Sequence, residues 1–173
     1  MKQVAVFGRN FNEGFKESVI EFFEIIKAHK YELSLFEPYY TFTKEFCAYD
    51  PKPDNLFNSC GNISEDTDMM FSIGGDGTFL ESVSFVKDKE IPIAGINAGR
   101  LGFLANISQE DIPVALNSIK EGRFNTEDRT LLEIQSNSEI FNENKYALNE
   151  ITVQKRDSGS MIIIKVFLNG EFL

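Results

Sequence analysis

The chain has 173 residues, of which 42% are hydrophobic, and a formal net charge of −10. This length is enough for one full domain, or for one domain and part of another. Because nucleic acids and anionic membranes attract basic surfaces, the acidic balance argues against both as partners, whereas a local loop can still bind a small phosphate ligand. No apolar run approaches the ~20 residues of a membrane span.

The few cysteine and histidine residues limit the kinds of chemistry that the chain can perform. Cys47 and Cys60 form no Cys-x-x-Cys pair, and residues 1–7 read as a strand rather than a signal peptide, so we expect free thiols and a cytoplasmic protein. His29 is the single histidine and lies near the end of an expected helix, so we expect no histidine-dependent mechanism.

The first 122 residues alternate between strand-like and helix-like segments. We expect strands at 2–7, 31–37, 68–73 and 91–96, and helices at 14–29, 41–47, 78–88 and 108–120. The last of these helices is expected to begin at an N-cap serine, Ser108. Strands joined by helices indicate a parallel sheet.

After Gly122 the pattern changes to β-rich segments without intervening helices. They cover 129–135, 146–154 and 161–168, and the last is followed by Asn169-Gly170, a hairpin-type turn. We therefore predict an α/β fold class, with a Rossmann-like parallel-sheet domain over residues 1–125 and the first strands of an all-β domain over residues 126–173. Three or four strands make a poor β domain by themselves, so this second unit is expected to be incomplete.

Five residues between a buried strand and a helix carry the clearest chemical signal: Gly74-Gly75-Asp76-Gly77-Thr78. A strand that turns through glycines into a helix presents backbone N–H groups and a positive dipole end to an anion. Glycines that merely permit a tight turn are the alternative, but a carboxylate between them gains nothing from packing. We therefore expect Asp76 to act as a general base or as a ligand to a magnesium ion, with Thr78 and the backbone amides holding phosphate oxygens.

A second glycine loop follows the next buried strand, with the sequence Asn97-Ala98-Gly99-Arg100-Leu101-Gly102-Phe103-Leu104. The carboxyl ends of parallel strands meet at one edge of the sheet, where ligands bind in open α/β folds. The two loops are therefore expected to share that edge. Arg100 lies inside the second loop and is as well explained by a functional role as by a surface position.

Four stretches together resemble the bacterial members of the ATP-NAD kinase family. The Gly74–Thr78 loop is a signature shared by NAD kinases, diacylglycerol-type lipid kinases and, in a variant, 6-phosphofructokinases. Three further stretches select the NAD kinases: the loop at 97–104, Asp-Arg-Thr-Leu-Leu-Glu at 128–133, and Ala147-Leu148-Asn149-Glu150. Their order and spacing match over nearly the whole chain.

The resemblance implies an enzyme that transfers the γ-phosphate of ATP, or in some members of polyphosphate, to the 2′-hydroxyl of the adenosine ribose of NAD. It implies that Asp76 is the base that takes the hydroxyl proton, and that Gly77 contacts the dinucleotide with it. Phe103 matches an aromatic residue beside the adenine, and Asn149 and Glu150 match residues that bind the adenosine and its ribose. The implied cofactor is a divalent cation, expected to be Mg²⁺. The predicted site residues are Gly74, Gly75, Asp76, Gly77, Thr78, Phe103, Asn149 and Glu150.

The chain departs from the family pattern in two places. A Gly-Ser-Thr-Ala-Tyr-Ser stretch that contributes to the NAD site in the family is not among residues 1–173, so we expect these residues to be inactive, or nearly so, alone. Where the family often has a basic residue before a methionine, Ser160 precedes Met161, and we assign neither Lys155 nor Arg156 to the site.

Two other functions fit part of the sequence. A lipid kinase of the same superfamily would share the glycine loop, but the net charge of −10 and the Asn149-Glu150 match speak against it. A nucleotide-binding module without catalysis would share both loops. NAD and ATP are the expected small-molecule partners, and because family members are commonly dimers or tetramers, we expect a homo-oligomer.

Overall fold

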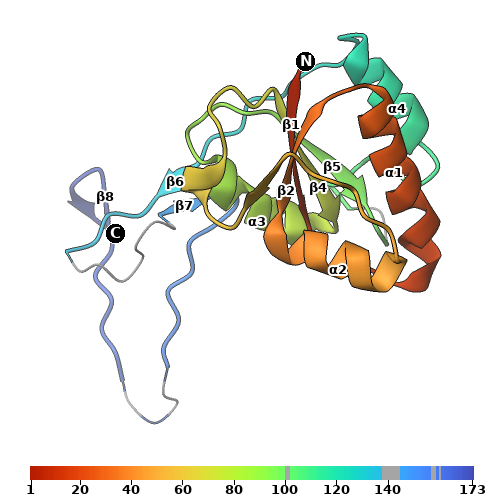
Figure 1. The fold of residues 1–173 in the computed structure, drawn as a ribbon. Coiled ribbons are helices and arrows are strands. Elements are labelled where there is room, and N and C mark those ends of the chain that lie inside the picture. The colour runs from red at the N-terminus through yellow and green to blue at the C-terminus, as the bar shows by residue number, and fades with distance from the viewer. Residues whose placement is uncertain (100–101, 138–144, 157–158, 160) are drawn as a thin grey trace.

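A five-stranded parallel sheet forms the centre of the molecule (Figure 1). The computed structural model describes residues 1–99, 102–137, 145–156, 159 and 161–173. The strands are β1 (Gln3–Gly8), β2 (Glu32–Phe36), β3 (Asn55–Phe57), β4 (Met69–Gly74) and β5 (Ile93–Asn97), in the order β3-β2-β1-β4-β5. The α-helices are α1 (Lys16–Ala28), α2 (Glu37–Cys47), α3 (Asp76–Val86) and α4 (Ile112–Lys120), and short 3₁₀ turns lie at Glu13–Phe15 and Cys60–Asn62. This arrangement confirms the predicted Rossmann-like α/β class.

Helices cover both faces of the sheet. Phe22 of α1 packs against Phe71 of β4, whereas Phe85 of α3 packs against Phe7 of β1. Val6 is the register partner of Phe71, and Phe7 follows it directly. Because successive strand residues point to opposite faces, α1 and α3 lie on opposite sides of the sheet. Helix α4 lies beside α1 (Figure 1).

Phenylalanine side chains fill much of the core, which accounts for their abundance in the sequence. On the α3 side, Phe7, Phe36 and Phe57 from three strands all contact Phe85, with ring centroids 4.9 to 5.6 Å apart. Tilted and edge-on contacts at these separations are the arrangements that aromatic rings favour. This packing fixes β1, β2 and β3 against α3.

The starts of α2 and α4 and one additional strand differ from the sequence prediction. Helix α2 begins at Glu37 rather than near 41, because Pro38 lies in its first turn, where no backbone donor is needed. Helix α4 begins at Ile112, and Ser108 donates to the Asp111 side chain at 2.7 Å instead of capping a helix. The region between α2 and β4 was expected to be a loop, but Asn55–Phe57 pairs with β2 as the edge strand β3.

Strand pairing after residue 126 is far shorter than predicted. Strands β6 (Leu132–Glu133) and β7 (Tyr146–Ala147) form one antiparallel pair, and β8 (Phe167–Leu168) and β9 (Glu171–Phe172) form another. The described residues of 148–156 and 161–166 are not in strands, because they have no neighbouring strand to pair with, and they extend away from the α/β unit (Figure 1). The predicted turn is confirmed, since Asn169 and Gly170 have φ of 52° and 88° between β8 and β9. The domain division at 125/126 stays a prediction.

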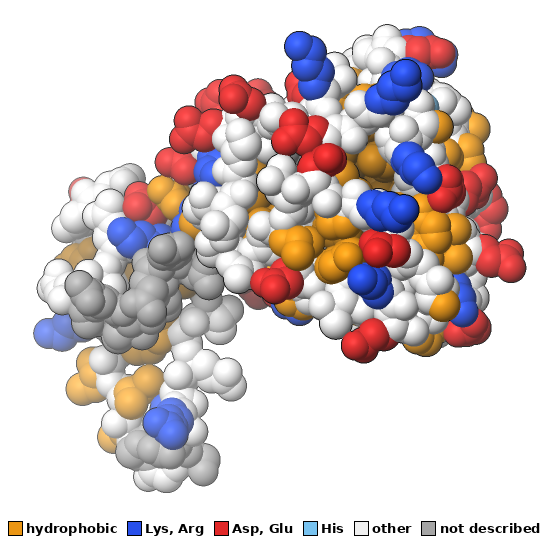
Figure 2. Space-filling view, in the orientation of Figure 1, with side chains coloured by type: hydrophobic (Ala, Val, Ile, Leu, Met, Phe, Trp, Pro, Cys, Tyr) orange, Lys and Arg blue, Asp and Glu red, His pale blue; other side chains and the backbone are white. Residues whose placement is uncertain are grey.

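The surface charge and the helix lengths are relevant to nucleic-acid and membrane contacts. On the face shown in Figure 2, Lys and Arg side chains are interspersed with Asp and Glu rather than gathered into a patch. Within the described part of the chain, every helix is too short or too polar to cross a bilayer.

Candidate active site

The first glycine loop joins β4 to α3 as predicted, and its first glycine is required by the fold. Gly74 has a φ of 156°, and a β-carbon there would lie 2.6 Å from Cβ of Thr78. Gly75 is the N-cap residue of α3, and Asp76 is the first helical residue, two positions earlier than the predicted start. The loop therefore turns directly into the helix and leaves the first amides of α3 at its open end.

Gly75 and Gly77 are not required by packing. A β-carbon at either position would meet no atom within 4 Å. Gly77 lies in the first turn of α3, where alanine would stabilise a helix by about 0.5–1 kcal/mol relative to glycine. Open space above a helix N-terminus instead lets an anionic ligand approach the backbone closely.

The Asp76 carboxylate is held by the second glycine loop. Its Oδ2 accepts the peptide N–H of Phe103 at 2.9 Å, and its Oδ1 accepts the N–H groups of Leu104 and Ala105 at 3.0 Å each. These hydrogen bonds, from Ala105 first and then from Phe103 and Leu104, lower the pKa of Asp76 below its ordinary value. The side chain is therefore ionised throughout the neutral pH range.

Asn97 shapes the second loop from inside. Its side chain is buried; Oδ1 accepts the N–H of Gly99 at 2.7 Å, and Nδ2 donates to the carbonyl of Ala105 at 3.3 Å. The loop then returns beside β5, because the N–H of Ile107 donates to the carbonyl of Gly95 at 3.0 Å. Gly95 allows this return, since a β-carbon there would lie 2.6 Å from Cα of Ala105.

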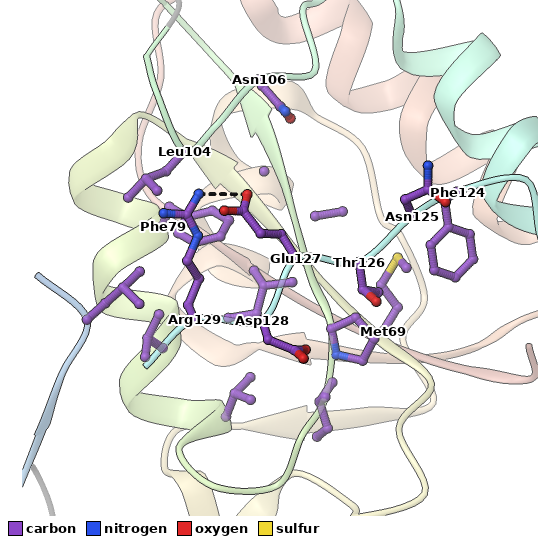
Figure 3. Close-up of a pocket in the computed structure, with 18 of the residues that line it drawn as sticks. Met69, Phe79, Leu104, Asn106, Phe124, Asn125, Thr126, Glu127, Asp128 and Arg129 are labelled. Carbon is purple, nitrogen blue, oxygen red and sulfur yellow. Dashed lines mark hydrogen bonds and ion pairs between the residues drawn. The ribbon is translucent and has the colours of Figure 1, made fainter. Parts of the chain in front are cut away.

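Two cavities flank the loops. A cleft of about 1190 Å³ has an apolar wall from α3 and β5 and a second wall from residues 123–131 (Figure 3). It reaches Phe103 and Leu104 but none of the residues Gly74–Thr78, so it lies beside the glycine loops rather than over them. A smaller cavity of about 270 Å³ lies between residues 12–15 and the start of the second loop.

The structure places the other predicted site residues unequally. Phe103 is 97% exposed at the rim of the large cleft, where its ring is free to stack on a base. Asn149 and Glu150 are exposed and directly follow β7, which lies against α3. The described contacts bring Phe103 to Asp76 but link neither Asn149 nor Glu150 to the glycine loop. The two positions singled out as open questions, Arg100 and Ser160, lie outside the described residues.

Sequence reasoning did not assign two features of this edge. Arg9 follows β1 beside the glycine loop: its N–H donates to the carbonyl of Ile73 at 3.2 Å, and its guanidinium forms an ion pair with Glu81 of α3. The amides that hold Asp76 also escaped notice, because backbone donors leave no signature in a sequence. The only trace of this contact in the sequence is Gly102, the glycine just before the three residues whose amides bind Asp76.

A divalent cation at this edge would be held mainly by substrate phosphates rather than by side chains. Among the described residues, no group of three or more His, Cys, Asp and Glu side chains lies together. Mg²⁺ is usually held by one or two carboxylates and by substrate phosphates, so such a cluster is not required. Three acceptor positions of the Asp76 carboxylate are already taken by amides, which leaves little capacity for a protein-held metal.

Comparison with known proteins gives a consistent result. Residues 13–124 match the family model for the ATP-NAD kinase N-terminal domain. The chain is 37% identical over 169 residues to an NAD kinase from Bacteroides fragilis, a match that covers 98% of this chain and 57% of that protein. It is 44% identical over 119 residues to an NAD kinase from Flavobacterium psychrophilum, covering 68% of this chain and 40% of that protein. The chain thus spans little more than half the length of the relatives it matches.

A solved structure supports the same fold. The crystal structure of yeast NADH kinase complexed with NADH superimposes with a TM-score of 0.61 at 21% identity, covering 80% of this chain and 45% of that one. At this identity the likeness concerns the arrangement of the chain alone.

Proposed function

Since this chain belongs to the ATP-NAD kinase family, we propose that the protein phosphorylates the 2′-hydroxyl of the adenosine ribose of NAD to give NADP. The observation that carries the proposal is the position of Asp76, an ionised carboxylate at the N-terminus of α3 and between two glycine loops. A carboxylate would repel phosphates bound at the same helix N-terminus, so its position there favours a chemical role, and accepting a proton from an attacking hydroxyl is one.

Asp76 would act as the general base, with a low pKa that suits phosphoryl transfer. The transition state of this reaction is loose, and the hydroxyl loses its proton late, so the catalytic carboxylate serves mainly to orient the nucleophile. A strongly basic group is not needed. The amides that lower the pKa of Asp76 would also keep its carboxylate ionised and in a fixed orientation.

The donor phosphates would lie at the open N-terminus of α3. The backbone amides of Gly75 and Gly77 and the hydroxyl of Thr78 would hold their oxygens, with the space above both glycines admitting the ligand. A divalent cation, which we expect to be Mg²⁺, would be held mainly by those phosphate oxygens and would neutralise their charge. ATP is the expected donor, with polyphosphate as the alternative.

The dinucleotide would contact Phe103 and the segment after β7. Phe103 offers an exposed ring for the adenine, and Gly77 allows the ribose to approach Asp76. Asn149 can donate to and accept from a base edge, and Glu150 can accept from ribose hydroxyls. Both lie shortly after β7, which packs beside α3, so closure of this segment over the loops would bring them to the dinucleotide.

Residues 1–173 alone should make little NADP, because they span 57% of the length of the Bacteroides fragilis relative. We infer a cytoplasmic, homo-oligomeric protein; apolar side chains such as Met161 and Ile163, 97% and 89% exposed, are available for association. Analytical ultracentrifugation of the full-length protein tests this inference, and a monomer at micromolar concentration would contradict it.

The test of the proposed reaction is an assay of NADP formation by the full-length protein with NAD, ATP and Mg²⁺, beside the Asp76→Asn variant. We expect NADP from the wild type and a loss of about 10²–10⁴-fold in kcat for the variant, the usual contribution of a general base. Binding of nucleotides without NADP from either protein would favour a non-catalytic module. Phosphorylation of diacylglycerol instead of NAD would favour a lipid kinase. Full activity of Asp76→Asn would remove Asp76 from the mechanism.

A further inference from the structure

Asp76 is bound by several groups of residues 102–105 rather than by a single hydrogen bond. Three successive peptide N–H groups, of Phe103, Leu104 and Ala105, converge on one carboxylate. The preceding residue is a glycine, and a β-carbon on Gly102 would overlap both carboxylate oxygens of Asp76. The lack of a side chain is explained by the carboxylate beside it.

We propose that residues 102–105 are a positioning element for Asp76 and that Oδ2 is the oxygen that takes the substrate proton. In this arrangement Gly102 provides the space for the carboxylate, and the three amides fix its orientation. The inference rests on the proposed function, because it names the atom and the supporting residues of that same site.

The count of acceptor positions assigns the reactive oxygen. An ionised carboxylate offers about four acceptor positions, two on each oxygen. Among the described residues, Oδ1 accepts two amides and is full, whereas Oδ2 accepts only the N–H of Phe103. The one open position is therefore on Oδ2. A ribose hydroxyl can donate there without any amide being displaced, so the carboxylate acts as base in the orientation that it already has.

The neighbouring groups support a fixed orientation rather than a loose one. Asn97, which is buried, binds both the start of the loop at Gly99 and its end at Ala105. The loop is thus tied to β5 from inside while its amides face Asp76. Rotation of the carboxylate would leave three peptide donors without their acceptor, which disfavours the rotated orientation.

The test compares Gly102→Ala with Gly99→Ala in the full-length protein. Gly99 belongs to the same loop, but a β-carbon there would meet no atom within 4 Å, so this substitution controls for a change of glycine alone. Titration of the ¹³C-labelled Asp76 carboxyl carbon reports its pKa, and steady-state kinetics report kcat and KM for NAD.

We expect Gly102→Ala to push the carboxylate off its amides, which raises the pKa of Asp76 toward its ordinary value. A displacement of this kind should lower kcat by about 10²-fold, with a KM for NAD within about twofold of wild type. Gly99→Ala should leave both readouts unchanged. An unaltered Asp76 titration in Gly102→Ala would overturn the positioning element. A shifted titration with unaltered kcat would overturn the catalytic role of Asp76 and leave the contact as a structural one.

A second pair of variants separates one amide from the rest and applies if Gly102→Ala does not fold. Phe103→Pro removes the N–H that binds Oδ2, whereas Phe103→Ala removes the same ring and keeps that N–H. The proline variant should show the higher Asp76 pKa and the lower kcat of the two. Equal pKa values in the two variants would contradict the role of the Phe103 N–H in holding the carboxylate.

Discussion

The peptide N–H of Phe103 donates to Oδ2 of Asp76 at 2.9 Å, so the proposed adenine contact and the proposed base are joined by one hydrogen bond. The ring of the same residue is 97% exposed and takes no part in the core. Backbone and side chain of Phe103 thus have separate tasks: the first orients the carboxylate and the second is available to the dinucleotide.

Replacing the Phe103 ring should therefore weaken dinucleotide binding alone. Stacking of a base on an aromatic side chain contributes about 1–3 kcal/mol, so Phe103→Ala should raise the dissociation constant for NAD by about 5- to 150-fold. Because the N–H is kept, the pKa of Asp76 should not change, and because the ring is exposed, neither should the free energy of unfolding. Isothermal titration calorimetry measures the binding. Phe103→Trp, which keeps a stacking surface, is the control, and equal NAD affinity in the alanine and tryptophan variants would contradict the role.

The glycines of the first loop should respond to alanine in opposite ways. Gly74→Ala places a β-carbon against Thr78 at a φ of 156°, and such overpacking costs about 1–3 kcal/mol or more. Gly77→Ala meets nothing and adds a good helix former, so it should stabilise the chain by about 0.5–1 kcal/mol. Urea unfolding of both variants measures this difference.

Gly77→Ala should weaken nucleotide binding even though it stabilises the fold. If ligands approach the backbone at this position, the added methyl group of the more stable variant should still weaken ATP or NAD binding. A Gly77→Ala variant that is both more stable and equally tight in binding both nucleotides would show that the open space above α3 is not a ligand site.

Acid should remove the stabilising contact of Asp76. Its amide hydrogen bonds lower its pKa in the folded state, so they stabilise the fold fully above the ordinary aspartate value of about 3.9 and are lost as the pH falls through the lower folded value. The difference in unfolding free energy between wild type and Asp76→Asn should therefore be largest near about pH 6 and shrink toward about pH 3. Urea unfolding at several pH values measures it.

Asp68 provides the matched control for that titration. Partial burial raises its pKa, but the N–H groups of Lys2 and Gln3, at 2.6 and 2.9 Å, outweigh this and lower it overall. Asp68→Asn should show the same kind of acid dependence while NADP formation stays near the wild-type rate. A difference between wild type and Asp76→Asn that does not vary with pH would mean that the amides do not favour the charged form.

The sequence was sufficient for the parts of the fold that have local signals. The buried runs that form β4 and β5, and the glycines after them, predicted both loops at one edge of the sheet. The edge strand Asn55–Phe57 was missed because it is only three residues long and follows two prolines. The prediction of long strands after residue 126 was wrong, because a β-rich segment becomes a strand only where a partner strand is present to pair with it.

The site was predicted unevenly for a related reason. The role of Asp76 was suggested by its chemistry, but its orientation depends on peptide N–H groups, which any sequence supplies. Gly102 is needed because the second loop lies close to the Asp76 carboxylate of the first, and this proximity of two loops is not visible in the sequence. Asn149 and Glu150 stay predictions, because the described contacts do not bring them to Asp76.

Asn97 offers a test of how the second loop is held without touching a ligand contact. Removing its side chain leaves the N–H of exposed Gly99 and the carbonyl of buried Ala105 without these partners, and the loss at the buried carbonyl typically costs about 1–3 kcal/mol. Asn97→Ala should therefore lower the unfolding free energy by that amount and speed amide hydrogen exchange at Phe103, Leu104 and Ala105. Asn106→Ala, at an exposed position of the same segment, should stay within about 0.5 kcal/mol of wild type. Unchanged exchange at the three amides in Asn97→Ala would mean that the loop is held in place by other contacts.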